Sequence, residues 1–289
     1  DGYEGWTGDD DDDDDDNDGE GNTEGGRQIL AGVGYSMGAI VLSNYVARSG
    51  RGCRLDAAMA VSGGLDMREQ LNFYRSMRLW QPMLAKELRD TLIVGKTEAR
   101  YRSRLTEAQY LDLMRASSIS SIDDQAVVTY NSYDDLTHYY TEMSAMGDTD
   151  AFRSLTSSSS SSSENSTSCA AEDSSIASMG RIADVSIPFC VLHALDDPLV
   201  TWRTTGRNPS KLVESGTGHV MMLLTKNGGH VGWPLGMNPR TEGWRWMNDA
   251  VRDFVVAADG ALREEQADRS SREDGDGDGG GGAVAARES

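Results

Sequence analysis

The feature that most constrains this chain is a five-residue turn, Gly-Tyr-Ser-Met-Gly at residues 34–38. The turn joins a short apolar run of strand type, residues 29–35, to a segment with apolar side chains at helical spacing, residues 39–46. A serine on so sharp a strand-to-helix turn has a strained backbone, and flanking glycines are expected because a Cβ there would clash. We therefore expect the Ser36 hydroxyl to stand above the sheet edge. The backbone N–H of Met37 is then aimed at a developing oxyanion.

Three further short apolar runs predict strands, at residues 55–62, 187–194 and 220–225. The helix after the turn is expected to end at Gly50 and to act as the crossover to the strand at 55–62. That strand would then lie parallel to the strand before the turn. The pattern therefore predicts an α/β fold with a mostly parallel sheet and helices on both faces.

The rest of the chain divides into one folded domain and several low-complexity segments. We expect an α/β domain over residues 27–258, with a helical insertion at 66–150 that covers the turn and an amphipathic helix closing the domain near its end. Three segments are expected to be disordered from their composition. They are an acidic segment at 1–26, a serine-rich insertion at 156–168 and a polar tail at 259–289.

Charge and cysteine content exclude some classes of function. Much of the formal charge of −20 lies in two acidic stretches, residues 9–16 and 264–278, which repel themselves and stay solvated. Such a chain repels a phosphate backbone, so nucleic acid is not expected as a partner. Cys53, Cys169 and Cys190 have no spacing typical of a disulfide framework or a zinc site. No apolar run approaches the length of a membrane span, and no signal peptide is visible.

A serine nucleophile needs a base, and the base needs a carboxylate that orients it. Ser36, Asp197 and His230 occur in the order Ser, Asp, His, and each follows a predicted strand, so all three are expected at one edge of the sheet. The acid could be Asp196 or Asp197. We favour Asp197, which directly precedes Pro198, but the sequence leaves this choice open.

Four histidines compete for the role of base. His193 lies inside a predicted strand and is expected to pack, and His138, between aromatic residues, is expected to be a packed residue as well. His219 precedes the strand at 220–225, so it lies about 20 Å from the far end of that strand and on the wrong edge. His230 follows the same strand on a Gly-Gly loop and is the expected base.

With these residues in view, the chain resembles the α/β-hydrolase branch that contains YheT-type esterases, plant embryogenesis-associated hydrolases and animal membrane-associated lipid hydrolases. The resemblance rests on five stretches, of which the last two are highly specific for this branch: residues 5–9, 33–38, 139–140, 187–198 and 227–233. It implies a Ser36–Asp197–His230 triad, no metal or cofactor, and a carboxylic ester hydrolase that acts on acyl lipids. Members of this branch are often membrane-associated, so the resemblance also implies contact with a membrane surface.

Two features depart from that family. The earlier strands of the fold, and the His-Gly loop that supplies a second oxyanion donor, have no counterpart in the sequence. With no initiator methionine, the chain is expected to be an N-terminally incomplete α/β-hydrolase whose strand at 29–35 forms a sheet edge. Two alternative functions follow, a catalytically impaired relative that binds a lipid or a partner, and an acyltransferase that uses the same triad.

Overall fold

The computed structural model describes residues 28–147, 180–206, 208–214, 218–236 and 238–275. The acidic segment predicted at 1–26 and the serine-rich insertion predicted at 156–168 lie outside the described residues.

Four parallel strands form one sheet in the order β1-β2-β3-β4. Their bounds are Ala31–Tyr35 for β1, Ala57–Val61 for β2, Phe189–Ala194 for β3 and Val220–Thr225 for β4. Each lies within the apolar run that predicted it, and the crossover from β1 to β2 is the helix α1 (Met37–Ser49), which ends at Gly50 as expected. Within the described sheet β1 has a neighbour on one side only, which is the predicted edge.

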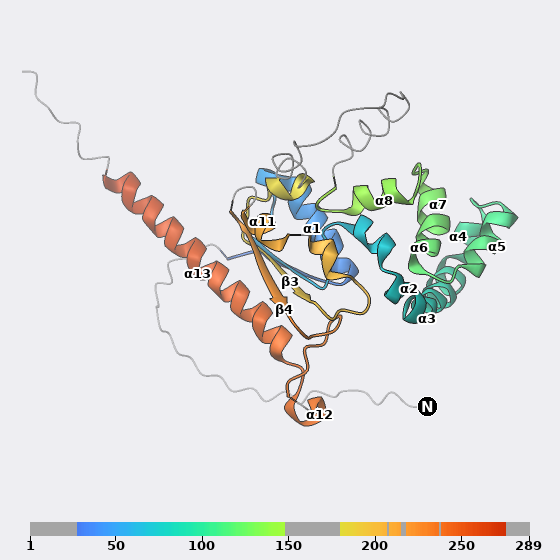
Figure 1. Ribbon diagram of the computed structural model, residues 1–289. Coiled ribbons are helices and arrows are strands. Elements are labelled where there is room, and N and C mark those ends of the chain that lie inside the picture. The colour runs from blue at the N-terminus through green and yellow to red at the C-terminus, as the bar shows by residue number, and fades with distance from the viewer. Residues whose placement is uncertain (1–27, 148–179, 207, 215–217, 237, 276–289) are drawn as a thin grey trace, which may run out of the picture.

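The two faces of the sheet are covered by different helices (Figure 1). Alternate side chains of the strands, such as Ala58 and Val191, pack against α1. Their neighbours Met59 and Leu192 point to the other face, where the first half of α13 (Trp246–Gly275) covers them. Because β2 and β3 are buried on both faces, their sequences are apolar rather than alternating, apart from His193 in β3.

Short one-turn or two-turn elements complete this α/β body. They are η1 (Gly50–Gly52), η5 (Gly180–Asp184), η6 (Trp202–Thr205), α11 (Pro209–Glu214) and α12 (Pro239–Glu242). No helix in the described part of the chain combines the length and apolar character needed to cross a bilayer.

Helix α13 differs from the expectation for the C-terminus. It continues past Ala258 to Gly275, so residues 259–275 are helical where the sequence predicts a disordered tail. This stretch carries good helix formers and is supported by pairs one turn apart, Arg263 with Asp259 at 2.9 Å and Arg269 with Glu265 at 2.5 Å. Local helix propensity therefore extends the element beyond its apolar contacts with the sheet.

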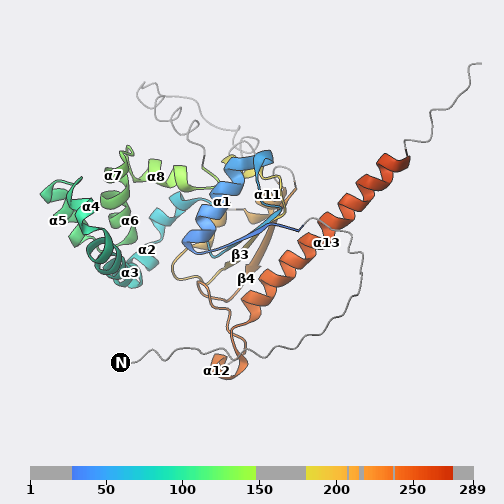
Figure 2. The ribbon, with the colours of Figure 1, turned by 180° about the vertical axis from the view of Figure 1, so that it is seen from behind.

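The predicted insertion after β2 is helical and lies beside the sheet rather than on it (Figures 1 and 2). It has its own apolar core, which includes Ile93, Tyr110 and Leu113. Its elements are η2 (Met67–Asn72), α2 (Tyr74–Leu79), α3 (Gln81–Glu87), η3 (Leu88–Thr97), α4 (Glu98–Arg102), α5 (Glu107–Arg115), α6 (Ile119–Ile122), η4 (Asp123–Val128), α7 (Thr129–Asn131) and α8 (Leu136–Met143).

One buried carboxyl group lies where this insertion meets the body. The Tyr140 hydroxyl donates a 2.8 Å hydrogen bond to Asp123, and the Tyr140 ring packs with Ile40 of α1 and with Met67. Burial raises the pKa of Asp123 to about 6. The charged form is therefore disfavoured in the folded protein.

This shift predicts that the effect of Asp123→Asn on the free energy of unfolding depends on pH. The neutral carboxyl stabilises the fold fully below pH 3.8, the ordinary pKa of the group, and this contribution is lost as the pH rises through about 6. Relative to the variant, the parent should lose about 2 kcal/mol of unfolding free energy between pH 4 and 7. Urea unfolding of both proteins across that range measures the difference, with Asp112→Asn on the exposed surface of α5 as a control for the loss of one charge. A difference that does not change with pH would contradict the prediction.

Candidate active site

Ser36 lies between the last residue of β1 and the first of α1, in a conformation that few residues adopt. Its φ is 51° and its ψ is −119°. The backbone N–H of Ser36 donates to Val61 O of β2 at 2.9 Å, and its carbonyl accepts from Ala39 and Ile40 in the first turn of α1. The sheet and the helix together hold this strained residue in place, as expected of a functional position.

The two glycines of the turn play different roles. A Cβ on Gly34 would lie 2.5 Å from Gly38 O and 2.8 Å from Ala39 N, both backbone atoms that cannot move aside. A Cβ on Gly38 would meet nothing within 4 Å. The expectation that any Cβ would clash is confirmed for Gly34 and is wrong for Gly38, because the helix turns that position away from the strand.

This contrast makes Gly34→Ala and Gly38→Ala a matched pair. Gly34→Ala should lower the free energy of unfolding by about 1–3 kcal/mol, because the new methyl group overpacks against backbone. Gly38→Ala should leave it unchanged or raise it by up to about 1 kcal/mol, because alanine favours the helix. Urea unfolding of both variants tests this. An equal loss in the two would show that the clash at Gly34 does not set the cost.

Asp197 follows β3 and is 4% exposed. Its Oδ1 accepts the backbone N–H of Leu199 at 2.8 Å and of Val200 at 3.0 Å, while Oδ2 lies 2.8 Å from His230 Nδ1. The two backbone donors fix the orientation of the carboxylate. One oxygen is thereby left to face the imidazole.

His230 bridges this carboxylate and the serine. With Nδ1 protonated and donating to Asp197, His230 Nε2 is left to accept from the Ser36 hydroxyl, and the two atoms are 2.7 Å apart. Residues from three loops, 161 and 33 positions apart along the chain, thus form one line of hydrogen bonds at the carboxyl edge of the sheet. Between the two acids that the sequence left open, the structure brings Asp197 to His230.

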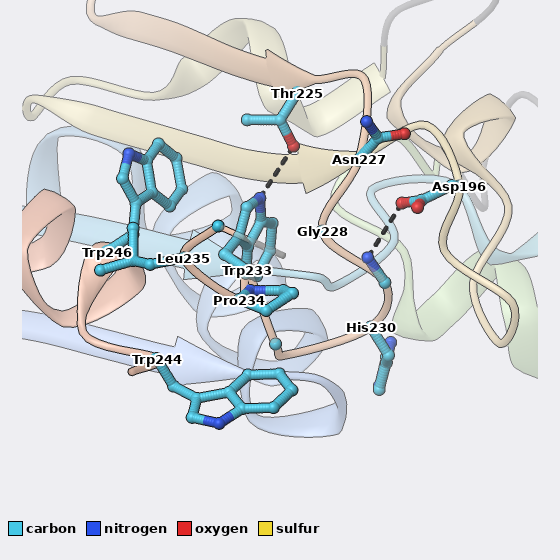
Figure 3. Close-up of a pocket in the computed structure, with 13 residues that line it drawn as sticks. Asp196, Thr225, Asn227, Gly228, His230, Trp233, Pro234, Leu235, Trp244 and Trp246 are labelled. Atoms are coloured by element: carbon cyan, nitrogen blue, oxygen red, sulfur yellow. Dashed lines mark hydrogen bonds between the residues drawn. The ribbon is translucent and has the colours of Figure 1, made fainter. Parts of the chain in front are cut away.

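The loop that carries His230 is tightly folded. A Cβ on Gly228 would lie 2.3 Å from the indole nitrogen of Trp233, so only glycine fits there. The backbone N–H of Trp233 donates to Gly228 O at 2.9 Å, and its indole N–H donates to Thr225 Oγ1 at 2.8 Å (Figure 3). A buried tryptophan therefore closes the loop back onto the end of β4.

The other three histidines lie where the sequence analysis expected them. His193 is fully buried in β3, 3.2 Å from Val200 O, and burial lowers its pKa. His219 precedes β4 at the opposite edge of the sheet, where its carbonyl accepts from Phe189 at 3.0 Å. His138 packs edge-on against Tyr133 in the insertion.

Met37 is the first residue of α1. The first backbone N–H groups of a helix have no partner within it and lie at the positive end of its dipole, which suits the oxyanion role expected of this N–H. Among the described residues, no three His, Cys, Asp or Glu side chains gather in a way that could hold a metal ion.

Two cavities adjoin the line of hydrogen bonds. A cavity of about 690 Å³ lies beside His230, with Trp233, Trp244 and Trp246 in its walls (Figure 3). A second, of about 480 Å³, lies between the insertion and the loop of Asp197, with Trp80 among its apolar lining residues. Sequence analysis did not find these tryptophans as site residues, because their apolar character equally fits a core.

Asp196 also has a place in the site that the sequence did not indicate. Its carboxylate accepts the backbone N–H of Gly229 at 2.9 Å, next to His230 (Figure 3). The only signal in the sequence was the pair of adjacent aspartates, and it pointed to a competing acid rather than to this contact.

Comparison with known proteins finds two that are similar to this chain in sequence. No family model matches the chain. It is 22% identical over 227 residues to the monoacylglycerol lipase of Saccharomyces cerevisiae, covering 77% of this chain and 41% of that protein. It is 25% identical over 238 residues to YheT of Escherichia coli, named as a candidate esterase, covering 81% of this chain and 56% of that protein. The chain thus spans about half the length of these curated relatives.

Among solved structures, an esterase of Pyrococcus furiosus aligns with a TM-score of 0.34 and 12% identity, over 79% of this chain and 54% of that one. The fold is assigned instead from the parallel sheet, the serine turn and the hydrogen bonds of the site. Parallel strands joined by a serine turn and helix, with an aspartate and a histidine after the later strands, make the α/β-hydrolase arrangement. The chain therefore has the α/β-hydrolase fold, and its sequence is similar to a lipase and to a candidate esterase.

Proposed function

We propose that this protein is a serine carboxylic-ester hydrolase in which Ser36 is the nucleophile, His230 the general base and Asp197 the acid that orients it. The observation that carries the proposal is the continuous pair of short contacts, 2.7 Å from Ser36 Oγ to His230 Nε2 and 2.8 Å from His230 Nδ1 to Asp197 Oδ2. A nucleophile, a base and an orienting group within hydrogen-bond reach is the geometry that acyl transfer requires.

The reaction follows from that geometry. Ser36 Oγ attacks the ester carbonyl carbon as its proton passes to His230 Nε2, and the resulting oxyanion is stabilised by the N–H of Met37. The C–O bond to the alcohol then breaks, and the alcohol leaves with the proton from His230. Water attacks the acyl group on Ser36, again with His230 as base, which releases a carboxylic acid and restores the serine.

The proposed substrates are acyl lipids, such as acylglycerols or phospholipid esters. The name of the monoacylglycerol lipase relative supports this class, as do the tryptophan side chains in the walls of the two cavities. Leu79, Trp80 and Met83 of the insertion also expose 62%, 42% and 59% of their surface, and the first two line the cavity next to Asp197. An exposed apolar patch at a cavity mouth is what an enzyme needs to take its substrate from a membrane surface. Nucleic acid remains an unexpected partner because of the net charge.

Labelling with a fluorophosphonate probe tests the proposal, because the probe reacts only with an activated serine. The parent should be labelled at Ser36 and should release fatty acid from a monoacylglycerol. A folded protein that is not labelled would contradict the proposal and favour a non-catalytic binding role. Labelling with transfer of the acyl group to an added alcohol, in preference to water, would instead favour an acyltransferase.

A further inference from the structure

We propose that Asp196 is a positioning residue that fixes the loop carrying His230. Asp196 Oδ1 accepts the backbone N–H of Gly229 at 2.9 Å, and no hydrogen bond from its side chain to His230 itself is present in the described structure. The inference rests on the proposed function, because it concerns the geometry of the same catalytic histidine.

The contact acts at the residue directly before His230. Gly229 has a φ of +62°, a left-handed conformation in which the chain turns sharply toward the imidazole. On the far side of His230 the loop is closed by Trp233, through its bond to Gly228 O. On the near side, the hydrogen bond from the Gly229 N–H to the Asp196 side chain ties the turn to the loop after β3. Rotation about the Gly229 backbone would swing the imidazole away from Ser36.

Asp196 is itself held firmly enough to serve as an anchor. The preceding residue, Leu195, donates its N–H to Thr225 O at 2.8 Å, which joins the ends of β3 and β4. The following residue, Asp197, donates its N–H to Ala194 O at 3.2 Å and closes a tight turn. The acid loop therefore contacts the histidine loop twice, through the Asp197 side chain to the imidazole and through Asp196 to the backbone beside it.

The two aspartates thus have different roles. Asp197 is buried and orients the imidazole ring, whereas Asp196 is exposed and sets where the loop holds that ring. An exposed hydrogen bond adds little to global stability, because water can replace it. The effect is expected in turnover instead, where a displacement of about 1 Å can cost about 100-fold.

The test compares Asp196→Ala with Asp196→Asn. The alanine variant should have a kcat about 10- to 100-fold below the parent, slower labelling by a fluorophosphonate probe, and an unchanged urea midpoint. The asparagine variant keeps an oxygen that can accept from Gly229 and should recover kcat to within about threefold of the parent. Asp112→Ala, an exposed aspartate of α5, controls for loss of a surface carboxylate.

Each other outcome overturns the inference. Unchanged kcat in the alanine variant would show that the Gly229 contact does not position His230. Equal losses in the alanine and asparagine variants would assign the effect to charge, and an alanine variant that unfolds would assign Asp196 to stability. A parent that the probe does not label would instead count against the proposed function, so the two failures are distinguishable.

Discussion

Ser36→Ala should lower kcat for a short-chain nitrophenyl ester by about a millionfold, with little change in the urea midpoint. In the proposed mechanism the Ser36 oxygen forms the acyl-enzyme, and neither His230 nor Asp197 can replace it. In the variant, the imidazole faces a methyl group and has no hydroxyl to activate. Initial rates measured at saturating ester, with the active-site concentration of the parent titrated by a fluorophosphonate, give the ratio.

Ser62→Ala is the matched control for this experiment. Ser62 also has a positive φ, 53°, directly after the neighbouring strand β2, but its buried hydroxyl has no hydrogen-bond partner among the described residues. Its removal should therefore leave kcat within threefold of the parent. Retention of activity in Ser36→Ala, or an equal loss in Ser62→Ala, would rule out Ser36 as the nucleophile.

His230→Ala is expected to have a loss of comparable size, about a millionfold in kcat, because the serine is then left without a base. His219→Ala should retain kcat within threefold, since His219 lies at the opposite edge of the sheet, where it is linked to Phe189 through its backbone carbonyl rather than its imidazole. Turnover and urea unfolding of both variants separate a catalytic loss from a loss of folded protein. If His219→Ala proved to be the inactive one, the assignment of the base would be wrong.

Much of the fold followed from the sequence because its signals are local. Strand β2 is wholly apolar, and β3 is apolar apart from His193, as is expected of strands covered on both faces. The Gly-Tyr-Ser-Met-Gly turn predicted Ser36 at a strand-to-helix junction, because few residues allow so sharp a turn. The order of Ser36, Asp197 and His230 along the chain predicted one shared edge, because parallel strands all end on the same side.

Helix α13 shows the limit of such local signals. The loss of apolar spacing after Ala258 predicted a disordered tail, yet the helix continues to Gly275 through good helix formers and paired charges. Apolar periodicity records where a helix has a partner to pack against. It does not record where a helix ends.

The sequence by itself determined the strands, the serine turn and the set of candidate residues, because each depends on neighbours within a few positions. Only the tertiary structure shows which of Asp196 and Asp197 lies against the His230 imidazole. Adjacent residues on a tight turn point in different directions, and the choice depends on a histidine loop 33 residues away. It likewise decided that Gly34 must be a glycine and Gly38 need not be, because the atoms that a Cβ would meet come from how the helix folds back over the strand.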